Sequence, residues 1–227
     1  ALVASYYAER LGLDRLLSFD MGGTTAKACL IEDRKPTVTG LFEVDRMYRF
    51  KAGSGMPVII PAIDMIEIGA GGGSLASVDA LGLLKVGPRS AGSEPGPACY
   101  GRGGENPAVT DADLVLGLLD ADNFLGGDMQ LDKAASEAAI KPLADRLGTS
   151  VPQTARGIFQ VVNESMAAAA RAHATDRGID YRGMPVLAFG GAGPVHACHV
   201  AELLESTTVI YPPLASVLSA FGTLVTP

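Results

Sequence analysis

Two apolar segments joined by a turn rich in glycine and threonine constrain the fold of this chain most strongly. Residues 18–30 read SFDMGGTTAKACL, so one apolar segment ends at Asp20 and a second begins after the turn at 22–25. Short apolar runs separated by glycine are typical of strands, and so short a connection makes them antiparallel neighbours. The sequence therefore predicts a β-hairpin with strands at 16–20 and 26–32.

This turn contains more glycines and polar side chains than a hairpin needs, because one or two turn-forming residues suffice to reverse a chain. Backbone N–H groups exposed by glycine can approach phosphate oxygens closely, and a carboxylate at the end of a strand can hold Mg²⁺ through water. Asp20 is the predicted metal ligand. The predicted phosphate contacts are the amides of Gly22 and Gly23 and the side chains of Thr24, Thr25 and Lys27. A structural glycine hairpin with an aspartate cap is the alternative.

A second glycine turn, FGGAGPVH, follows an apolar segment at 186–189 and leads into a predicted helix with Pro194 at its first position. A helix N-terminus favours anions, so this turn is also a candidate nucleotide contact. Neither turn is followed by the GK[ST] of a P-loop, and neither forms a full dinucleotide fingerprint. The predicted cofactor contacts here are Gly190, Gly191, Ala192, Gly193 and His196.

The remaining pattern predicts an α/β fold, a mixed sheet with flanking helices. A third strand at 37–44 is expected to extend the hairpin into an antiparallel meander. Apolar residues at helical spacing predict helices at 1–11, 110–120, 132–147 and 151–177. Residues 186–211 predict a strand, a turn, a helix and a strand, and the glycine- and proline-rich residues 45–110 predict a loop-dominated insertion.

Composition excludes several classes of protein. The 227 residues are 48% hydrophobic and 19% charged, which is ordinary for a soluble globular chain. A net charge of −7 and the lack of a basic stretch argue against nucleic acid as a partner. No apolar run is long enough to predict a membrane span. The three cysteines lack metal or disulfide spacing, which favours a reducing compartment, so the chain is predicted to be cytoplasmic.

The motif IDMIEIGAGGGSLASVD is a candidate substrate site. Glu67 or Asp64 could line a cleft beside Gly71 and Gly72. A glycine bend between strands, without a ligand, is the alternative for this motif.

Cysteine and histidine offer fewer functional candidates. Cys99, within the loop at 89–104, would need a nearby histidine or cation to act as a nucleophile. His196 and His199 lie three residues apart on the predicted helix, which suits capping or packing as well as a metal. The sequence therefore predicts no metal other than Mg²⁺.

Five long motifs resemble a known enzyme family. In chain order they are FDMGGTTAKACLI, IDMIEIGAGGGSLASVD, LLKVGPRSAGSEPGPACYGRGG, VTDADLVLG and FGGAGPVHA. They run through nearly the whole chain and resemble the hydantoinase A/5-oxoprolinase family, near the N-methylhydantoinase A type and related to acetone carboxylase β subunits. Residues 1–227 would then be a single domain of this family, interrupted by the insertion at 45–110.

The resemblance implies an actin-like ATPase fold with a ribonuclease H-like core, as in Hsp70, sugar kinases and actin. In that superfamily nucleotide lies between two related domains, and each domain supplies a phosphate hairpin. By position, DMGGTTAK would be the second hairpin and FGGAGPVHA the adenosine turn. The first hairpin is absent from these residues, so the chain is expected to be the second half of a longer protein and to be inactive alone.

The resemblance also implies a reaction, in which ATP and Mg²⁺ serve to open a cyclic amide such as a hydantoin, an N-methylhydantoin or 5-oxoproline. Phosphoryl transfer to the amide oxygen would activate the ring, with Asp20, Thr24 and Thr25 as catalytic residues. The implied partners are the substrate, an upstream domain of the same chain and a hydantoinase B-type subunit. A ketone carboxylase subunit and a non-catalytic nucleotide-sensing module are the alternatives.

Overall fold

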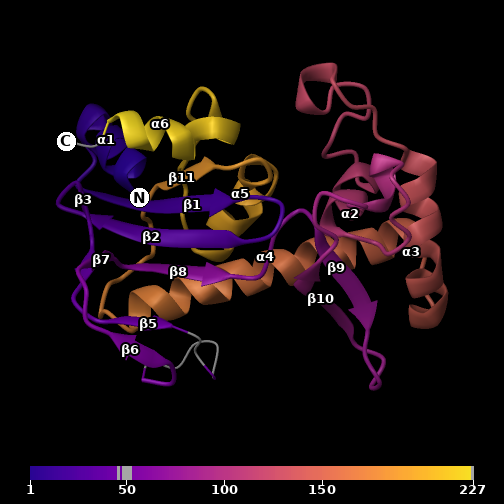
Figure 1. The fold of residues 1–227 in the computed structure, drawn as a ribbon, viewed down its shortest axis with the longest axis horizontal. Helices are drawn as coiled ribbons and strands as arrows, with labels where there is room; N and C mark the ends of the chain where they lie inside the picture. The colour runs from indigo at the N-terminus through magenta and orange to yellow at the C-terminus, as the bar shows by residue number, and fades with distance from the viewer. Residues whose placement is uncertain (45–46, 48–52, 226–227) are drawn as a thin grey trace. The chain divides into compact units, whose positions relative to one another are not determined.

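The structure, a computed structural model, describes residues 1–44, 47 and 53–225 (Figure 1). The chain divides into two compact units. Unit 1 contains Ala1–Asp20, Lys27–Glu67 and Ala167–Pro227, and unit 2 contains Met21–Ala26 and Ile68–Met166. The turn of the N-terminal hairpin thus belongs to unit 2, whereas most of its two strands belongs to unit 1. An insertion at 45–110 stays a prediction.

A six-stranded mixed sheet forms the centre of unit 1, in the order β12-β11-β1-β2-β3, with β8 also paired to β2. The strands are β1 (Arg15–Met21), β2 (Ala26–Glu32), β3 (Lys35–Pro36), β8 (Met65–Ile68), β11 (Val186–Phe189) and β12 (Val209–Ile210). β11 runs parallel to both β1 and β12, and β3 runs antiparallel to β2. β1 and β11 are buried along most of their length, which explains their continuous apolar sequences.

The predicted meander is only partly right. The hairpin of β1 and β2 and the strand, turn, helix and strand at 186–211 are confirmed. The single third strand at 37–44 is wrong, because the Thr39 hydroxyl accepts a hydrogen bond from the Leu41 N–H and bends the chain at Gly40. The segment forms two short strands that pair away from β2. They are β4 (Val38–Thr39), which pairs with β7 (Ala62–Ile63), and β5 (Phe42–Val44), which pairs with β6 (Met56–Val58).

The helices of unit 1 cover the sheet with small and aliphatic side chains. α1 (Leu2–Leu11) ends at Gly12, whose φ of 67° is the left-handed conformation that glycine adopts without a side-chain penalty. Its buried face packs with Leu16, Phe189 and Leu218 in one hydrophobic core. The other helices are α5 (Gly193–Leu203), α6 (Leu218–Leu224), the short 3₁₀ turn η3 (Ala215–Val217) and the part of α4 (Val151–Thr175) from Ala167 onward.

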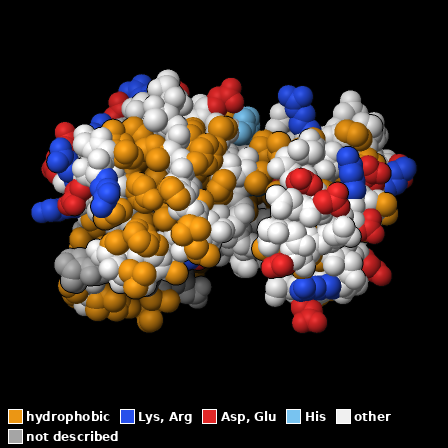
Figure 2. Space-filling model, turned by 90° about the horizontal axis from the view of Figure 1, so that it is seen from above, with side chains coloured by type: hydrophobic (Ala, Val, Ile, Leu, Met, Phe, Trp, Pro, Cys, Tyr) orange, Lys and Arg blue, Asp and Glu red, His pale blue; other side chains and the backbone are white. Residues whose placement is uncertain are grey.

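Hydrophobic side chains gather on the face of unit 1 that carries α1 and α6 (Figure 2). The exposed large hydrophobics of these helices and of residues 214–217 before α6 are Leu2, Leu11, Leu214, Val217 and Leu224. Exposed apolar side chains that adjoin one another are a feature of contact surfaces. In the part of the chain that the structure describes, no helix is long and apolar enough to cross a membrane.

Unit 2 packs helices around a second, smaller hairpin. Its elements are β9 (Ser74–Val78), β10 (Leu84–Ser90), η1 (Ala98–Tyr100), α2 (Val109–Val115), η2 (Leu125–Gly127), α3 (Lys133–Leu147) and α4 up to Met166. The predicted helices at 132–147 and 151–177 are confirmed within two residues, and α3 continues through Pro142. The helix predicted at 110–120 is shorter, since α2 ends at Val115, and the Asp111 carboxylate in its first turn accepts the Ala108 N–H at 2.8 Å.

Candidate functional site

The tip of the β1–β2 turn is exposed and offers unused donors. The turn is closed by a hydrogen bond of 3.0 Å from the Gly22 N–H to the Thr25 carbonyl. Gly23 and Thr24 are exposed, and among the described residues their N–H groups have no hydrogen-bond acceptor. Two free amides with a threonine hydroxyl beside them can bind an anion such as phosphate. Binding of phosphate by residues 22–25 stays a prediction.

The glycine-rich loop at 71–73 lies directly against this turn, inside unit 2. The Gly72 N–H donates to the Gly22 carbonyl at 3.0 Å, and the Gly73 N–H donates to the Gly23 carbonyl at 2.7 Å. Both predicted motifs therefore meet at one place. Gly71 and Gly72, predicted as substrate contacts, touch the backbone of the turn, and their contact with a substrate stays a prediction. Sequence reasoning missed this pairing because glycine motifs so far apart carry no signal that they meet.

Asp20 lies at the carboxyl end of β1, in unit 1, where its register partner on β11 is Phe189. Because the two strands are parallel, Asp20 and the turn after Phe189 lie at the same edge of the sheet. The carboxylate is partly exposed and accepts a hydrogen bond of 3.0 Å from the Ser219 hydroxyl of α6. Ser219 is a site residue that the sequence did not indicate, because it follows Asp20 by 199 positions.

The second glycine turn is shaped by Gly190, whose φ of 87° disfavours any side chain. The Gly190 N–H donates to the Ala215 carbonyl at 2.9 Å, which ties the turn to the segment before α6. Gly191 is exposed and Ala192 partly exposed, whereas Gly193, at the start of α5, is buried. His196 is completely buried. The exposed part of this turn, at 190–192, is therefore the part that a ligand could reach.

The charged candidates have protein partners within unit 1. Lys27 forms an ion pair with Glu67 at 3.7 Å, and both side chains are about half exposed. Such a pair contributes about 0–1 kcal/mol to stability. Lys27 could therefore leave Glu67 and bind a ligand phosphate with little loss of free energy. Asp64 is mostly buried and accepts two hydrogen bonds from the Arg177 guanidinium. Asp64 is thus committed to a structural ion pair.

A hydrated Mg²⁺ fits the residues at this edge of the sheet. Mg²⁺ keeps several waters and binds one or two carboxylates together with substrate phosphates. Asp20 supplies one partly exposed carboxylate, which its hydrogen bond with Ser219 orients. Among the described residues, no group of three or more histidine, cysteine or acidic side chains could hold a metal ion. The remaining ligands of Mg²⁺ would therefore be waters and substrate phosphates.

Cys99 is not a nucleophile at neutral pH. The residue is completely buried in η1. Burial raises the pKa of its thiol, and the neighbouring Asp111 carboxylate raises this pKa further. A thiol must ionise to attack, so the loop at 89–104 offers no nucleophile through Cys99.

Only one of the three cysteines should react in the folded protein. Burial raises the pKa of Cys29 to about 11 and also suppresses ionisation of Cys99, whereas Cys198 is exposed on α5. We expect iodoacetamide at pH 8 to modify Cys198 alone, and to modify all three in guanidinium, as mapped by peptide mass spectrometry. Rapid modification of Cys99 in the folded protein would contradict the structure.

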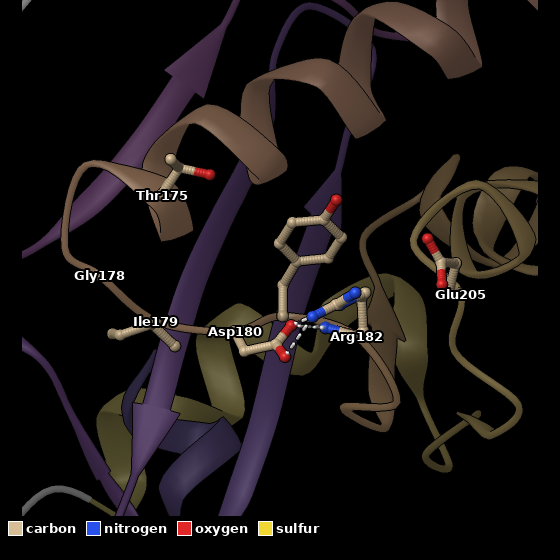
Figure 3. Close-up of a pocket in the computed structure, with 7 residues that line it drawn as sticks. Thr175, Gly178, Ile179, Asp180, Arg182 and Glu205 are labelled. Carbon is tan, nitrogen blue, oxygen red and sulfur yellow. Dashed lines mark hydrogen bonds and ion pairs between the residues drawn. The ribbon is translucent and has the colours of Figure 1, made fainter.

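An open pocket of about 390 Å³ lies elsewhere in unit 1, lined by residues that include Asp180, Arg182 and Glu205 (Figure 3). Arg182 donates two hydrogen bonds of 2.9 Å to the Asp180 carboxylate, and these hydrogen bonds lower the pKa of Asp180 to about 2. Arg15, at the first residue of β1, contacts the Asp180 carbonyl. Because Asp20 is near the other end of β1, the pocket is separate from the glycine turns.

Known proteins resemble this chain over nearly its whole length. The sequence matches the family described as Hydantoinase/oxoprolinase over residues 1–226. Caprolactamase subunit alpha of Pseudomonas jessenii is 40% identical, over 95% of this chain and 30% of its own length. The crystal structure of this ATP-dependent caprolactamase matches with a TM-score of 0.82, 38% identity, and coverage of 97% of this chain and 31% of that one.

Two further relatives are an acetone carboxylase and a 5-oxoprolinase. The nucleotide-free structure of acetone carboxylase, which carries out ATP-dependent acetone carboxylation, matches with a TM-score of 0.85 and 33% identity, covering 97% of this chain and 30% of that chain. 5-Oxoprolinase 1 of Arabidopsis thaliana is 33% identical, over 97% of this chain and 18% of its own length. The chain spans a third or less of the length of these relatives. It has the mixed α/β fold of the solved structures, and it belongs to the hydantoinase/oxoprolinase family.

Proposed function

We propose that this chain is the nucleotide-binding part of an ATP-dependent enzyme that opens a cyclic amide. The observation that carries the proposal is the turn at 22–25, where the N–H groups of Gly23 and Thr24 have no acceptor among the described residues and lie beside a threonine hydroxyl. The ATP dependence of caprolactamase and of acetone carboxylation supports nucleotide as the ligand. The fold is proposed to be the second half of an actin-like ATPase.

The chemical need for ATP follows from the stability of the amide bond. Transfer of the γ-phosphoryl group to the amide oxygen breaks the β–γ anhydride and makes the amide carbon a better electrophile for water. Hydrolysis then yields the ring-opened amino acid, ADP and phosphate. Two waters are consumed, because one attacks the amide carbon as the ring nitrogen leaves, which gives an acyl phosphate, and the second hydrolyses the acyl phosphate to the carboxylate and phosphate.

The residues of this chain position groups and stabilise charge in such a transfer. The amides of Gly23 and Thr24 and the hydroxyls of Thr24 and Thr25 would bind phosphate oxygens. Asp20 would hold hydrated Mg²⁺, which would neutralise phosphate charge. The turn at 190–193 would bind the adenosine part, and Lys27 would leave Glu67 to add positive charge near the phosphates.

The substrate and the partners follow from the relatives. A lactam, a hydantoin or 5-oxoproline is the proposed substrate class, since caprolactamase and 5-oxoprolinase both act on cyclic amides. The proposed partners are the rest of a longer chain and a second, B-type subunit, because the caprolactamase relative is itself a subunit. The structural similarity to acetone carboxylase supports an alternative, in which the enzyme phosphorylates a ketone for carboxylation.

Phosphate release by the full-length protein tests this proposal. We expect 5-oxoproline, a hydantoin or caprolactam to stimulate ATP turnover about tenfold or more, with the ring-opened product forming at the rate of ADP. Acetone or acetophenone with bicarbonate would stimulate turnover instead if the carboxylase alternative is correct. The isolated 227 residues should show no substrate-stimulated turnover. Nucleotide binding without stimulation by either substrate class would favour a sensing module.

A further inference from the structure

The backbone behind the phosphate-binding turn is held by a second glycine segment, the loop at 71–73. Two hydrogen bonds of 3.0 and 2.7 Å run from the amides of Gly72 and Gly73 to the carbonyls of Gly22 and Gly23. Both turn carbonyls are therefore occupied by the loop. The amides of Gly23 and Thr24, in contrast, stay without protein acceptors among the described residues, which leaves them for a ligand.

The contact between loop and turn is possible only because the loop has no side chains. A Cβ atom placed on Gly71 would lie 2.6 Å from the carbonyl carbon of Gly23 and 2.6 Å from the Thr24 nitrogen. A Cβ on Gly73 would lie 2.9 Å from the Gly23 oxygen. Neither position has a positive φ, so what requires glycine here is the close approach of another backbone.

The loop is in turn fixed to the start of α2. The Thr110 N–H and the Thr110 hydroxyl both donate to the Gly72 carbonyl, at 2.7 and 2.8 Å. The next residue, Asp111, is completely buried and accepts hydrogen bonds from the Ala108 and Cys99 N–H groups, both at 2.8 Å. A continuous chain of hydrogen bonds thus runs from α2 through Gly72 to the turn, all within unit 2.

We propose that Gly71, Gly72, Gly73 and Thr110 are positioning residues for phosphoryl transfer. They would fix the amides of Gly23 and Thr24 where the phosphate charge develops, without touching the substrate themselves. A preorganised donor stabilises a transition state only if it is held in place, and a shift of about 1 Å can lower the rate about 10²-fold. This inference rests on the proposed function, because it assumes that the turn binds phosphate.

Replacing Gly71 in the full-length enzyme tests whether the close approach of the loop to the turn is needed for catalysis. We expect Gly71→Ala to lower kcat for substrate-stimulated phosphate release about 10²-fold, because the added methyl displaces the turn. The Kd of a non-hydrolysable ATP analogue should rise less than about tenfold, since the turn at 190–193 is unchanged. Gly40→Ala is the matched control, because Gly40 is exposed and its Cβ would meet no atom within 4 Å. Equal kcat values for the two variants would overturn the proposal.

Replacing Thr110 tests whether the hydrogen bonds behind the loop are needed, without adding volume to the side chain. Thr110→Val replaces the hydroxyl by a methyl group of similar size, and we expect kcat to fall about tenfold, with Thr110→Ser restoring most of it. The control is Thr154→Val, because Thr154 is also a buried threonine of unit 2, and its hydroxyl bonds Thr149 at 2.8 Å, away from the loop. A loss of kcat that is the same in both valine variants, or that serine fails to restore, would show a merely structural role.

Hydrogen exchange separates failure of this inference from failure of the proposed function. The Gly72 and Gly73 amides should exchange about tenfold faster or more in Gly71→Ala and Thr110→Val than in their controls, because their bonds to the turn weaken. Unchanged exchange in an active enzyme would overturn the positioning role alone. A full-length protein without ATP turnover would refute the proposed function and the catalytic role together. Hydrogen exchange would then test only whether the loop at 71–73 holds the turn in place.

Discussion

Replacing Asp20 by asparagine in the full-length enzyme is expected to lower kcat for substrate-stimulated phosphate release about 10²-fold or more. The substitution keeps the shape of the side chain and its place at the carboxyl end of β1, but removes the negative charge that would hold hydrated Mg²⁺. Charge at the transferring phosphoryl group is greatest in the transition state, so kcat should fall more than the affinity for nucleotide. Steady-state phosphate release, combined with calorimetric titration of a non-hydrolysable ATP analogue, measures the two effects separately.

Two further variants make this experiment specific. Asp14→Asn is the matched control, because Asp14 is an exposed carboxylate that precedes β1 at its other end, where it pairs with Arg34. It should leave kcat unchanged. Ser219→Ala removes the hydrogen bond that orients Asp20 and should lower kcat by less than about tenfold. If the Asp20→Asn enzyme turns over ATP as fast as the Asp14→Asn control, the Asp20 carboxylate has a structural role only and no role in phosphoryl transfer.

The sequence predicted correctly those helices and strands that are determined by residues close together in the chain. The hairpin at 16–32 follows from two apolar runs around glycine, and α4 follows from a stripe of apolar residues that begins at a Ser150–Gln153 capping box. The strand at 37–44 failed because its alternation resembles a strand, whereas the Thr39 hydroxyl and Gly40 break it. The choice of partner for such short strands depends on distant segments, which local periodicity does not encode.

The sequence indicated candidate site residues one by one but did not indicate which of them contact one another. Glycines beside threonines indicated that residues 22–25 could bind phosphate, and the Gly23 and Thr24 amides have no acceptor in the part of the chain that the structure describes. The loop at 71–73 was interpreted as a substrate segment, since nothing in a glycine run shows that it packs on another glycine run. Ser219 gave no signal either, because a single serine on a short helix has many possible roles. Contacts between backbones and between distant single residues are fixed by tertiary packing alone.

Asp111→Ala is expected to have the largest effect on stability. The buried carboxylate accepts the N–H groups of Ala98, Cys99 and Ala108 and the Ser136 hydroxyl, at distances from 2.7 to 3.2 Å. Removing it leaves three buried backbone donors unsatisfied, each of which costs about 1–3 kcal/mol. We expect the free energy of opening of α2 to fall by roughly 4 kcal/mol, as measured by amide hydrogen exchange in the full-length protein.

Matched variants show whether this effect comes from burial and from the number of hydrogen bonds. Asp132 also begins a helix, but it is exposed, and its side chain accepts a single hydrogen bond, from the Ala135 N–H at 3.0 Å, so Asp132→Ala should cost about 1 kcal/mol at α3. Asp111→Asn keeps one acceptor oxygen and should lie between the two alanine variants. Equal losses for Asp111→Ala and Asp132→Ala would show that Asp111 acts as an ordinary helix cap. A larger loss at Asp111, together with faster exchange of the Gly72 amide, would show that one buried carboxylate stabilises both the core of unit 2 and the loop that holds the turn at 22–25.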